Sequence, residues 1–163
     1  MMRLPFVSRR REYIIERLLR DDAAEVARLH REDFSRPWSA AEFAGLIDQA
    51  TVFGFVAREV GRKQAIAGFV LARLAADEAE ILTVAVARAH RREGLGRELM
   101  EAVLRRLHAD RASHLILEVD ETNAPALALY QRLAFREIAR RRNYYEHASV
   151  SATGALVMRR DLR

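Results

Sequence analysis

A glycine-containing turn in the middle of the chain has the residue pattern of an anion-binding site. It follows an apolar run that ends at Val86 and precedes leucines at helical spacing, which predicts a strand, a turn and a helix. The first N–H groups of a helix are unpaired, and glycine lets an anion approach them closely. A plain tight turn is the alternative. The residues of this turn are Arg91, Arg92, Glu93, Gly94, Leu95, Gly96 and Arg97.

Two side chains downstream of the turn have groups that can transfer protons. Glu118 lies near the end of an apolar strand, and a right-handed crossover makes this strand parallel to the one ending at Val86. Because ligands in open α/β sheets bind at the carboxyl ends of such strands, we expect Glu118 near the turn as a general base. Tyr130, on the next helix, is a candidate general acid. A salt-bridged glutamate and a core tyrosine are the structural alternatives.

Several other kinds of site are excluded by what the sequence lacks. The chain has no cysteine, and therefore no disulfide, thiolate nucleophile or cysteine-type zinc site. Its 5 histidines are scattered without metal-binding spacing, so we expect no metal. The G-x-S-x-G, Walker and dinucleotide-binding patterns are absent.

The length and composition predict a single domain. With 163 residues, of which 50% are hydrophobic and 31% charged, we assign residues 13–163 to one domain, after a basic N-terminal arm at 1–12. No apolar run approaches the roughly 18 residues of a membrane span, and no signal-peptide core is evident, so we expect a cytoplasmic protein. The net charge of +5 is spread over scattered arginines, which argues against direct nucleic-acid binding.

The periodicity predicts the order β-α-α-β-β-β-α-β-α-β-β, an α/β (α+β) mixed sheet with helices on both faces. Asp21 or Asp22 is expected to cap the first helix, and Asn123 the last. Ser39 and Glu42 have the spacing of a capping box for the second. The predicted strands cover residues 13–18, 51–58, 64–73, 80–86, 114–119, 135–142 and 155–160.

These motifs resemble those of the GNAT superfamily of N-acetyltransferases. Arg91-x-x-Gly94-x-Gly96 matches its [RQ]-x-x-G-x-[GA] acetyl-CoA signature, in its usual place between the fourth strand and the third helix. Other motifs resemble the branch that acetylates the N-terminal alanine of a small-subunit ribosomal protein. They are Leu117-Glu118-Val119, Asn123, the run from Ala128 to Phe135, Arg142-Asn143-Tyr144-Tyr145, and His30, Phe34, Pro37, Trp38 and Ser39.

The resemblance implies a role for each part of the site. Glu118 would be the proton acceptor and Tyr130 the proton donor. The backbone at 84–86 would pair with the acetyl-pantetheine arm like an added strand, and the glycine turn would hold the pyrophosphate. The residues implied to contact acetyl-CoA are Val84, Ala85, Val86, Arg91, Arg92, Glu93, Gly94, Leu95, Gly96, Arg97 and Asn123. Those implied to flank the peptide acceptor are Trp38, Tyr144 and Tyr145.

The implied reaction is transfer of an acetyl group from acetyl-CoA to a protein N-terminus by direct attack. The thioester is already activated, so the protein must hold a neutral amine against its carbonyl carbon. An α-amine has a pKa of about 8 and a lysine about 10.4, a gap worth about 3.4 kcal/mol. One glutamate is therefore sufficient for an α-amine.

Three alternatives remain open at this point. They are a GNAT enzyme for lysine or a small amine, a non-catalytic acyl-CoA-binding module, and a basic RNA- or ribosome-binding domain. Trp38 has a structural alternative as an aromatic filling the gap between helices and sheet. Two residues depart from the family pattern. Ala134 replaces the usual glycine, at a cost of about 1 kcal/mol if its backbone is left-handed, and Glu146 replaces a proline. The sequence leaves the oligomeric state open.

Overall fold

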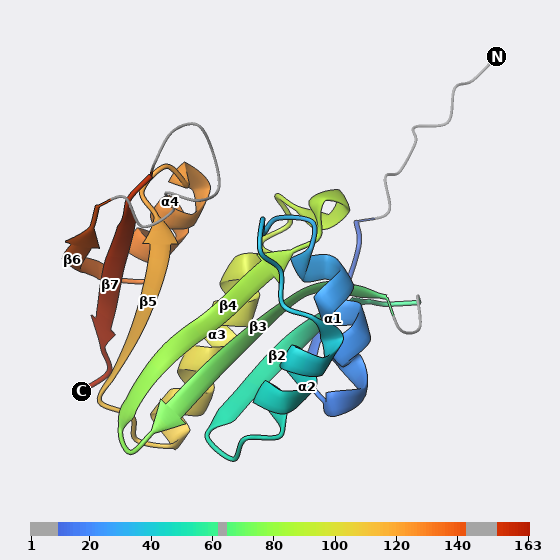
Figure 1. The fold of residues 1–163 in the computed structure, drawn as a ribbon, viewed down its shortest axis with the longest axis horizontal. Coiled ribbons are helices and arrows are strands. Elements are labelled where there is room, and N and C mark those ends of the chain that lie inside the picture. Colours follow the sequence, from blue (N-terminus) through green and yellow to red (C-terminus); the bar gives the residue numbers. More distant parts are fainter. Residues whose placement is uncertain (1–9, 62–64, 143–152) are drawn as a thin grey trace.

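A mixed seven-stranded sheet forms the centre of the protein, in the order β1-β2-β3-β4-β5-β7-β6 (Figure 1). The computed structural model describes residues 10–61, 65–142 and 153–163. All neighbouring strands are antiparallel except β4 and β5, which are parallel. The strands are β1 Tyr13–Arg17, β2 Val52–Glu59, β3 Ile66–Ala75, β4 Glu78–Val86, β5 His114–Asp120, β6 Arg136–Arg141 and β7 Ala155–Asp161.

The helices follow the predicted order, which is confirmed. They are α1 Ala23–His30, α2 Ala40–Ile47, α3 Leu95–Ala109 and α4 Ala124–Arg132. Two short 3-10 turns, η1 Arg20–Asp22 and η2 Arg88–His90, were not expected from the periodicity. The predicted arm falls largely on residues 1–9, outside the described residues. No helix in the described ranges has the length and apolarity needed to cross a membrane.

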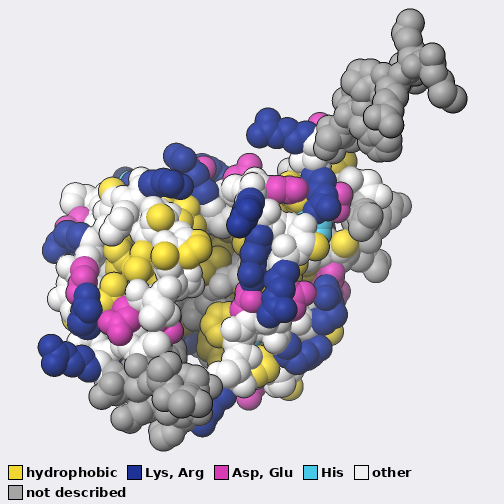
Figure 2. All heavy atoms as spheres, turned by 90° about the horizontal axis from the view of Figure 1, so that it is seen from above, with side chains coloured by type: hydrophobic (Ala, Val, Ile, Leu, Met, Phe, Trp, Pro, Cys, Tyr) yellow, Lys and Arg dark blue, Asp and Glu magenta, His cyan; other side chains and the backbone are white. Residues whose placement is uncertain are grey.

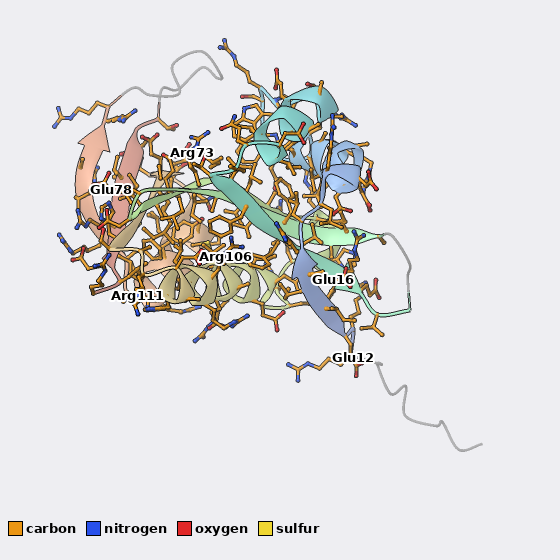
Figure 3. The ribbon with its side chains drawn as sticks, turned by 90° about the horizontal axis from the view of Figure 1, so that it is seen from below. Glu12, Glu16, Arg73, Glu78, Arg106 and Arg111 are labelled. Atoms are coloured by element: carbon orange, nitrogen blue, oxygen red, sulfur yellow. The ribbon has the colours of Figure 1, made fainter. Side chains whose placement is uncertain are left out.

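Helices cover both faces of the sheet and bury a separate core on each. On one face, α1 and α2 pack Val26, Leu29 and Phe43 against Phe69 of β3. On the other, α3 and α4 close a larger core. Figure 3 shows α3 along this second face, where Arg106 places its guanidinium 4.8 Å from the centre of the Phe53 ring. The apolar residues of α3 whose helical spacing predicted this helix are all buried: Leu95, Leu99, Val103, Leu104 and Leu107.

Two of the three predicted helix caps are confirmed with their side-chain bonds, and the third is confirmed in position only. Ser39 Oγ accepts from the Glu42 N–H and Glu42 Oε2 accepts from the Ser39 N–H, both at 3.1 Å. Asn123 Oδ1 accepts from the Ala126 N–H at 3.3 Å. Asp22 is the N-cap residue of α1, but its side chain makes no bond to that helix. One carboxylate oxygen accepts from the Leu19 N–H at the start of η1, at 2.9 Å, and the other accepts from Arg58 Nη2 at 2.6 Å.

The parallel strands β4 and β5 pair only where they begin. Glu78, Ala79 and Glu80 align with His114, Leu115 and Ile116, and no pairing follows. On the other side of β4, the register with β3 shifts so that Leu82 is an extra, bulged residue. A bulge increases the local twist of a strand. Figure 1 shows β4 and β5 diverging toward their carboxyl ends, so the later half of β4 has no strand on its β5 side among the described residues.

Candidate active site

The glycine turn leads directly into α3 and presents unpaired backbone donors. Gly94 is the N-cap residue, with a left-handed backbone (φ 77°) and no side-chain capping bond. The first intrahelical bond runs from the Glu98 N–H to Gly94 O, at 3.1 Å. The N–H groups of Leu95, Gly96 and Arg97 precede it and have no acceptor within the helix. The predicted strand–turn–helix geometry is confirmed, and anion binding by it stays a prediction.

The two glycines of the turn are needed for different reasons. At Gly94 the positive φ favours glycine, although an added Cβ would meet no atom within 4 Å. At Gly96 the space is limited, because a Cβ would lie 3.3 Å from Leu129 Cδ2 of α4. Gly96 therefore lets α3 and α4 approach, whereas Gly94 allows the chain to turn.

The charged side chains of the turn are held by the elements around it. Arg91 donates from Nε to Val86 O at 3.3 Å, and its Nη2 pairs with Asp33. Glu93 accepts a hydrogen bond from the Tyr13 hydroxyl of β1. The carboxylate in the turn therefore has a partner on its β1 side. Arg92 is exposed and has a left-handed backbone, at φ 64°.

The surface is hollowed between the α4 side of the molecule and the turn. Figure 2 shows this hollow from above, with apolar side chains on its walls and Arg side chains along one of them. Four arginines between the end of β4 and the first turn of α3 are exposed: Arg88, Arg91, Arg92 and Arg97. Apolar walls with a positive rim suit a ligand that has an apolar arm and anionic groups.

Glu118 lies on β5, on the sheet face opposite its buried neighbours Leu117 and Val119. Its side chain is 33% exposed, and its Oε1 lies 3.1 Å from Arg141 Nη2 of β6. The salt-bridged glutamate that the sequence left open is therefore present. No other ion pair or hydrogen bond to this side chain occurs within the described residues.

Tyr130 is buried within α4, with only 6% of the residue exposed. Its ring packs edge-on against Phe135, with centroids 5.8 Å apart. Burial raises the pKa of Tyr130 to about 12, so the hydroxyl carries its proton at neutral pH. The Tyr130 hydroxyl makes no hydrogen bond to a described residue. Among the described residues, every fully buried side-chain oxygen or nitrogen atom has a hydrogen-bond partner. The hydroxyl oxygen is therefore not fully buried and lies at the edge of the core. Tyr130 can therefore be a core residue and also a proton donor.

Residues 31–39, the α1–α2 loop, include Trp38 and lie against β4. The Trp38 ring is half-buried and packs on His30 at 5.2 Å and on Phe43 at 5.5 Å. The space-filling role left open for it is confirmed. Tyr144 and Tyr145, with Asn143 and Glu146, lie outside the described residues.

Val84, Ala85 and Val86 pair with β3 on one side and face the gap beside β5 on the other. Sequence reasoning gave no role to His30, Asp33 or Arg141, which connect the parts of the site. The buried histidine has a sequence signal, because aromatic residues follow it at helical spacing. Arg141 has none, since its partner is distant in sequence. No cluster of side chains able to bind a metal occurs in the described ranges.

Comparison with known proteins identifies the family. The profile of the Acetyltransferase (GNAT) family matches residues 23–135. The chain is 37% identical over 109 residues to the ribosomal protein bS18-alanine N-acetyltransferase of Escherichia coli K12, covering 67% of this chain and 71% of that protein. It is 34% identical over 147 residues to N-alpha-acetyltransferase RimI of Mycobacterium tuberculosis, covering 88% and 89%. The crystal structure of the ribosomal-protein-S18-alanine N-acetyltransferase from Escherichia coli superposes with a TM-score of 0.84 at 30% identity, covering 93% and 94%. The chain therefore belongs to the GNAT family and is an acetyl-CoA-dependent N-acetyltransferase.

Proposed function

We propose that this enzyme acetylates the α-amine of a protein N-terminus, and that its acceptor is the N-terminal alanine of a small-subunit ribosomal protein. The likeness to relatives named for that reaction supports the acceptor. The observation that carries the proposal is the gap between β4 and β5, which has the glycine turn at one strand end and Glu118 on the opposite strand. The cytoplasmic location expected from the sequence is compatible with a ribosomal acceptor.

The residues around this gap fit acetyl-CoA. The free edge of β4 at Val84, Ala85 and Val86 offers backbone groups to the amides of the pantetheine arm, as an additional strand would. The unpaired N–H groups at the start of α3 and the exposed arginines beside them suit the pyrophosphate. Asn123 uses Oδ1 to cap α4, which leaves its side-chain NH₂ for the coenzyme.

In the proposed reaction, the neutral α-amine attacks the thioester carbonyl carbon of acetyl-CoA. The C–N bond forms and the C–S bond breaks. Glu118 accepts the proton that the amine loses, directly or through a water molecule, on the oxygen that Arg141 does not hold. Tyr130 donates the proton that the departing thiolate takes up. Backbone N–H groups near Val84 and Val86 are positioned to stabilise the tetrahedral oxyanion.

The acceptor class is tested by parallel assays with acetyl-CoA and two peptides. One peptide begins with alanine and has a ribosomal-type sequence, and the other has a blocked N-terminus and one internal lysine. We expect acetylation of the first at a much higher kcat/KM. Preferential acetylation of the lysine peptide would instead support a lysine or small-amine transferase. Saturable acetyl-CoA binding without transfer to either peptide would contradict the proposal.

A further inference from the structure

His30 connects the α1–α2 loop to the strand that faces the coenzyme gap. It is the last residue of α1 and only 2% exposed. The Trp38 N–H donates to its Nδ1 at 3.1 Å, and its Nε2 lies 3.2 Å from Thr83 Oγ1 of β4. Thr83 directly follows the bulged residue Leu82. One imidazole therefore bonds both to the loop and to β4.

The hydrogen bonds determine the proton position on this ring. Because Trp38 donates to Nδ1, that nitrogen has no proton, and the proton of the neutral ring lies on Nε2. Nε2 then donates to Thr83 Oγ1. An imidazolium has protons on both nitrogens, so it cannot accept from the Trp38 N–H. The loop anchor requires the neutral ring.

Aromatic packing fixes the ring in this orientation. Phe34 stacks on it at 4.0 Å with an interplanar angle of 14°, and Phe43 approaches edge-on at 5.3 Å. The Phe34 N–H also donates to His30 O, at 3.2 Å. The loop thus leaves α1 at His30 and returns to the same residue before α2 begins. His30 therefore anchors both ends of this loop, whose acidic residues Glu32 and Asp33 are also held by Arg88 and Arg91.

We propose that His30 is a positioning residue, which holds the α1–α2 loop on β4 and so sets how the acceptor peptide meets the acetyl group. This inference rests on the proposed function, in which the Trp38 loop flanks the acceptor. His30 acts through Trp38 and Thr83 and touches neither substrate. Losing it should therefore affect the acceptor and spare the coenzyme.

The electrostatic surroundings of His30 support a neutral ring at physiological pH. Burial lowers the pKa of His30, and the charge of Asp33 in the same loop opposes this. Asp33 is paired with Arg91, from the turn before α3. The other packed side chains, Phe43 of α2, Phe69 of β3 and Thr83 of β4, do not titrate. The hydrogen bond from Trp38 to His30 should therefore weaken only at a pH below the ordinary titration range of histidine.

Steady-state kinetics with two substrates test the proposal. His30→Phe keeps the ring stacking but removes both hydrogen bonds, and it should raise the KM for the acceptor peptide about tenfold or more, as expected when buried hydrogen bonds are lost. The KM for acetyl-CoA should stay within about twofold, as should kcat at saturating peptide. His30→Asn restores an acceptor near Nδ1, and it should recover most of the peptide KM. The exposed His108→Phe is the matched control and should change neither KM.

The pH dependence gives a second readout that a merely structural role would not move. As the pH falls below the ordinary titration range of histidine, the peptide KM of the native enzyme should rise relative to that of His30→Asn, because only the native ring gains a proton. Thr83→Val removes the hydrogen bond between His30 and β4 with little change in side-chain shape. It provides the test if His30→Phe fails to fold. An unchanged peptide KM in Thr83→Val, or an equal rise in both KM values in His30→Phe, overturns the proposal. If the native enzyme prefers the lysine peptide, the proposed acceptor fails, and the same variants are then measured with that peptide.

Discussion

Arg141 of β6 reaches across β7 to place its Nη2 3.1 Å from Glu118 Oε1 on β5. The residue of β7 between these strands has a small side chain, because Arg141 and Asp120 both align with Ala155. A small residue there leaves room for the arginine side chain to cross. The proposed base is therefore oriented from a strand that does not pair with its own.

This relationship predicts that Arg141 acts through Glu118. Glu118→Gln should lower kcat/KM for the acceptor by about 10² to 10⁴, the usual loss for a general base, with acetyl-CoA binding retained. Arg141→Gln alone should lower it about tenfold, because Glu118 loses its orienting partner. In the Glu118→Gln background, the second substitution should add little, since the two residues act as one unit.

Arg140→Gln is the matched control for Arg141→Gln. Arg140 is the neighbour on β6, but it pairs with Glu121 and Glu137 and not with Glu118. Its loss should leave kcat/KM within about twofold, as for other exposed ion pairs. Fully additive effects of Arg141→Gln and Glu118→Gln would show that Arg141 does not work through Glu118.

Tyr130 is predicted to remain a proton donor far into alkaline solution. With a pKa of about 12, it stays almost fully protonated up to about pH 10, so it should cause no loss of activity up to that pH. Tyr130→Phe preserves the packing against Phe135 and should lower kcat about 10²-fold. In a spectrophotometric titration, native enzyme and Tyr130→Phe should show the same tyrosinate absorbance up to about pH 11. Above that pH the variant should show less, because it lacks the Tyr130 phenolate. Unchanged turnover would mean that Tyr130 is structural.

The two glycines of the turn should respond differently to alanine. Gly94→Ala places a side chain on a left-handed residue and should lower the free energy of unfolding by about 1 kcal/mol, with a higher KM for acetyl-CoA. Gly96→Ala gains helix propensity against a close contact with Leu129, and it should stay within about 0.5 kcal/mol of the native protein. Urea unfolding and the KM for acetyl-CoA are measured for each variant. Equal effects of Gly94→Ala and Gly96→Ala would contradict the different roles of the two glycines.

The fold was largely predictable because its local signals agree with one another. Periodic leucines placed α3, and the spacing of Ser39 and Glu42 placed the start of α2. The missing capping bond from Asp22 to α1 has a physical reason, since the Leu19 N–H and Arg58 of β2 occupy its two carboxylate oxygens. Local sequence cannot show a partner that arrives from another strand.

The site was predictable in its parts but not in its connections. The glycine turn, Glu118 and Tyr130 each follow from residue type and element order. β4 has a bulge at Leu82 and stops pairing with β5 after Glu80, and no residue in that apolar run signals either feature. The ion pair with Arg141 depends on the strand order β5-β7-β6, which a sequence pattern does not specify.

Ala134 provides a stability prediction at the end of α4. Its φ is 64°, its N–H donates to Gln131 O at 3.1 Å, and the Phe135 N–H donates to Tyr130 O at 3.0 Å, the bonds of a left-handed helix C-terminus that favours glycine. Ala134→Gly should raise the free energy of unfolding by about 0.5 to 1 kcal/mol. Ala128→Gly, in the same helix with regular backbone, should lower it by about 1 kcal/mol. Urea unfolding measures both, and equal losses would show that Ala134 is unstrained.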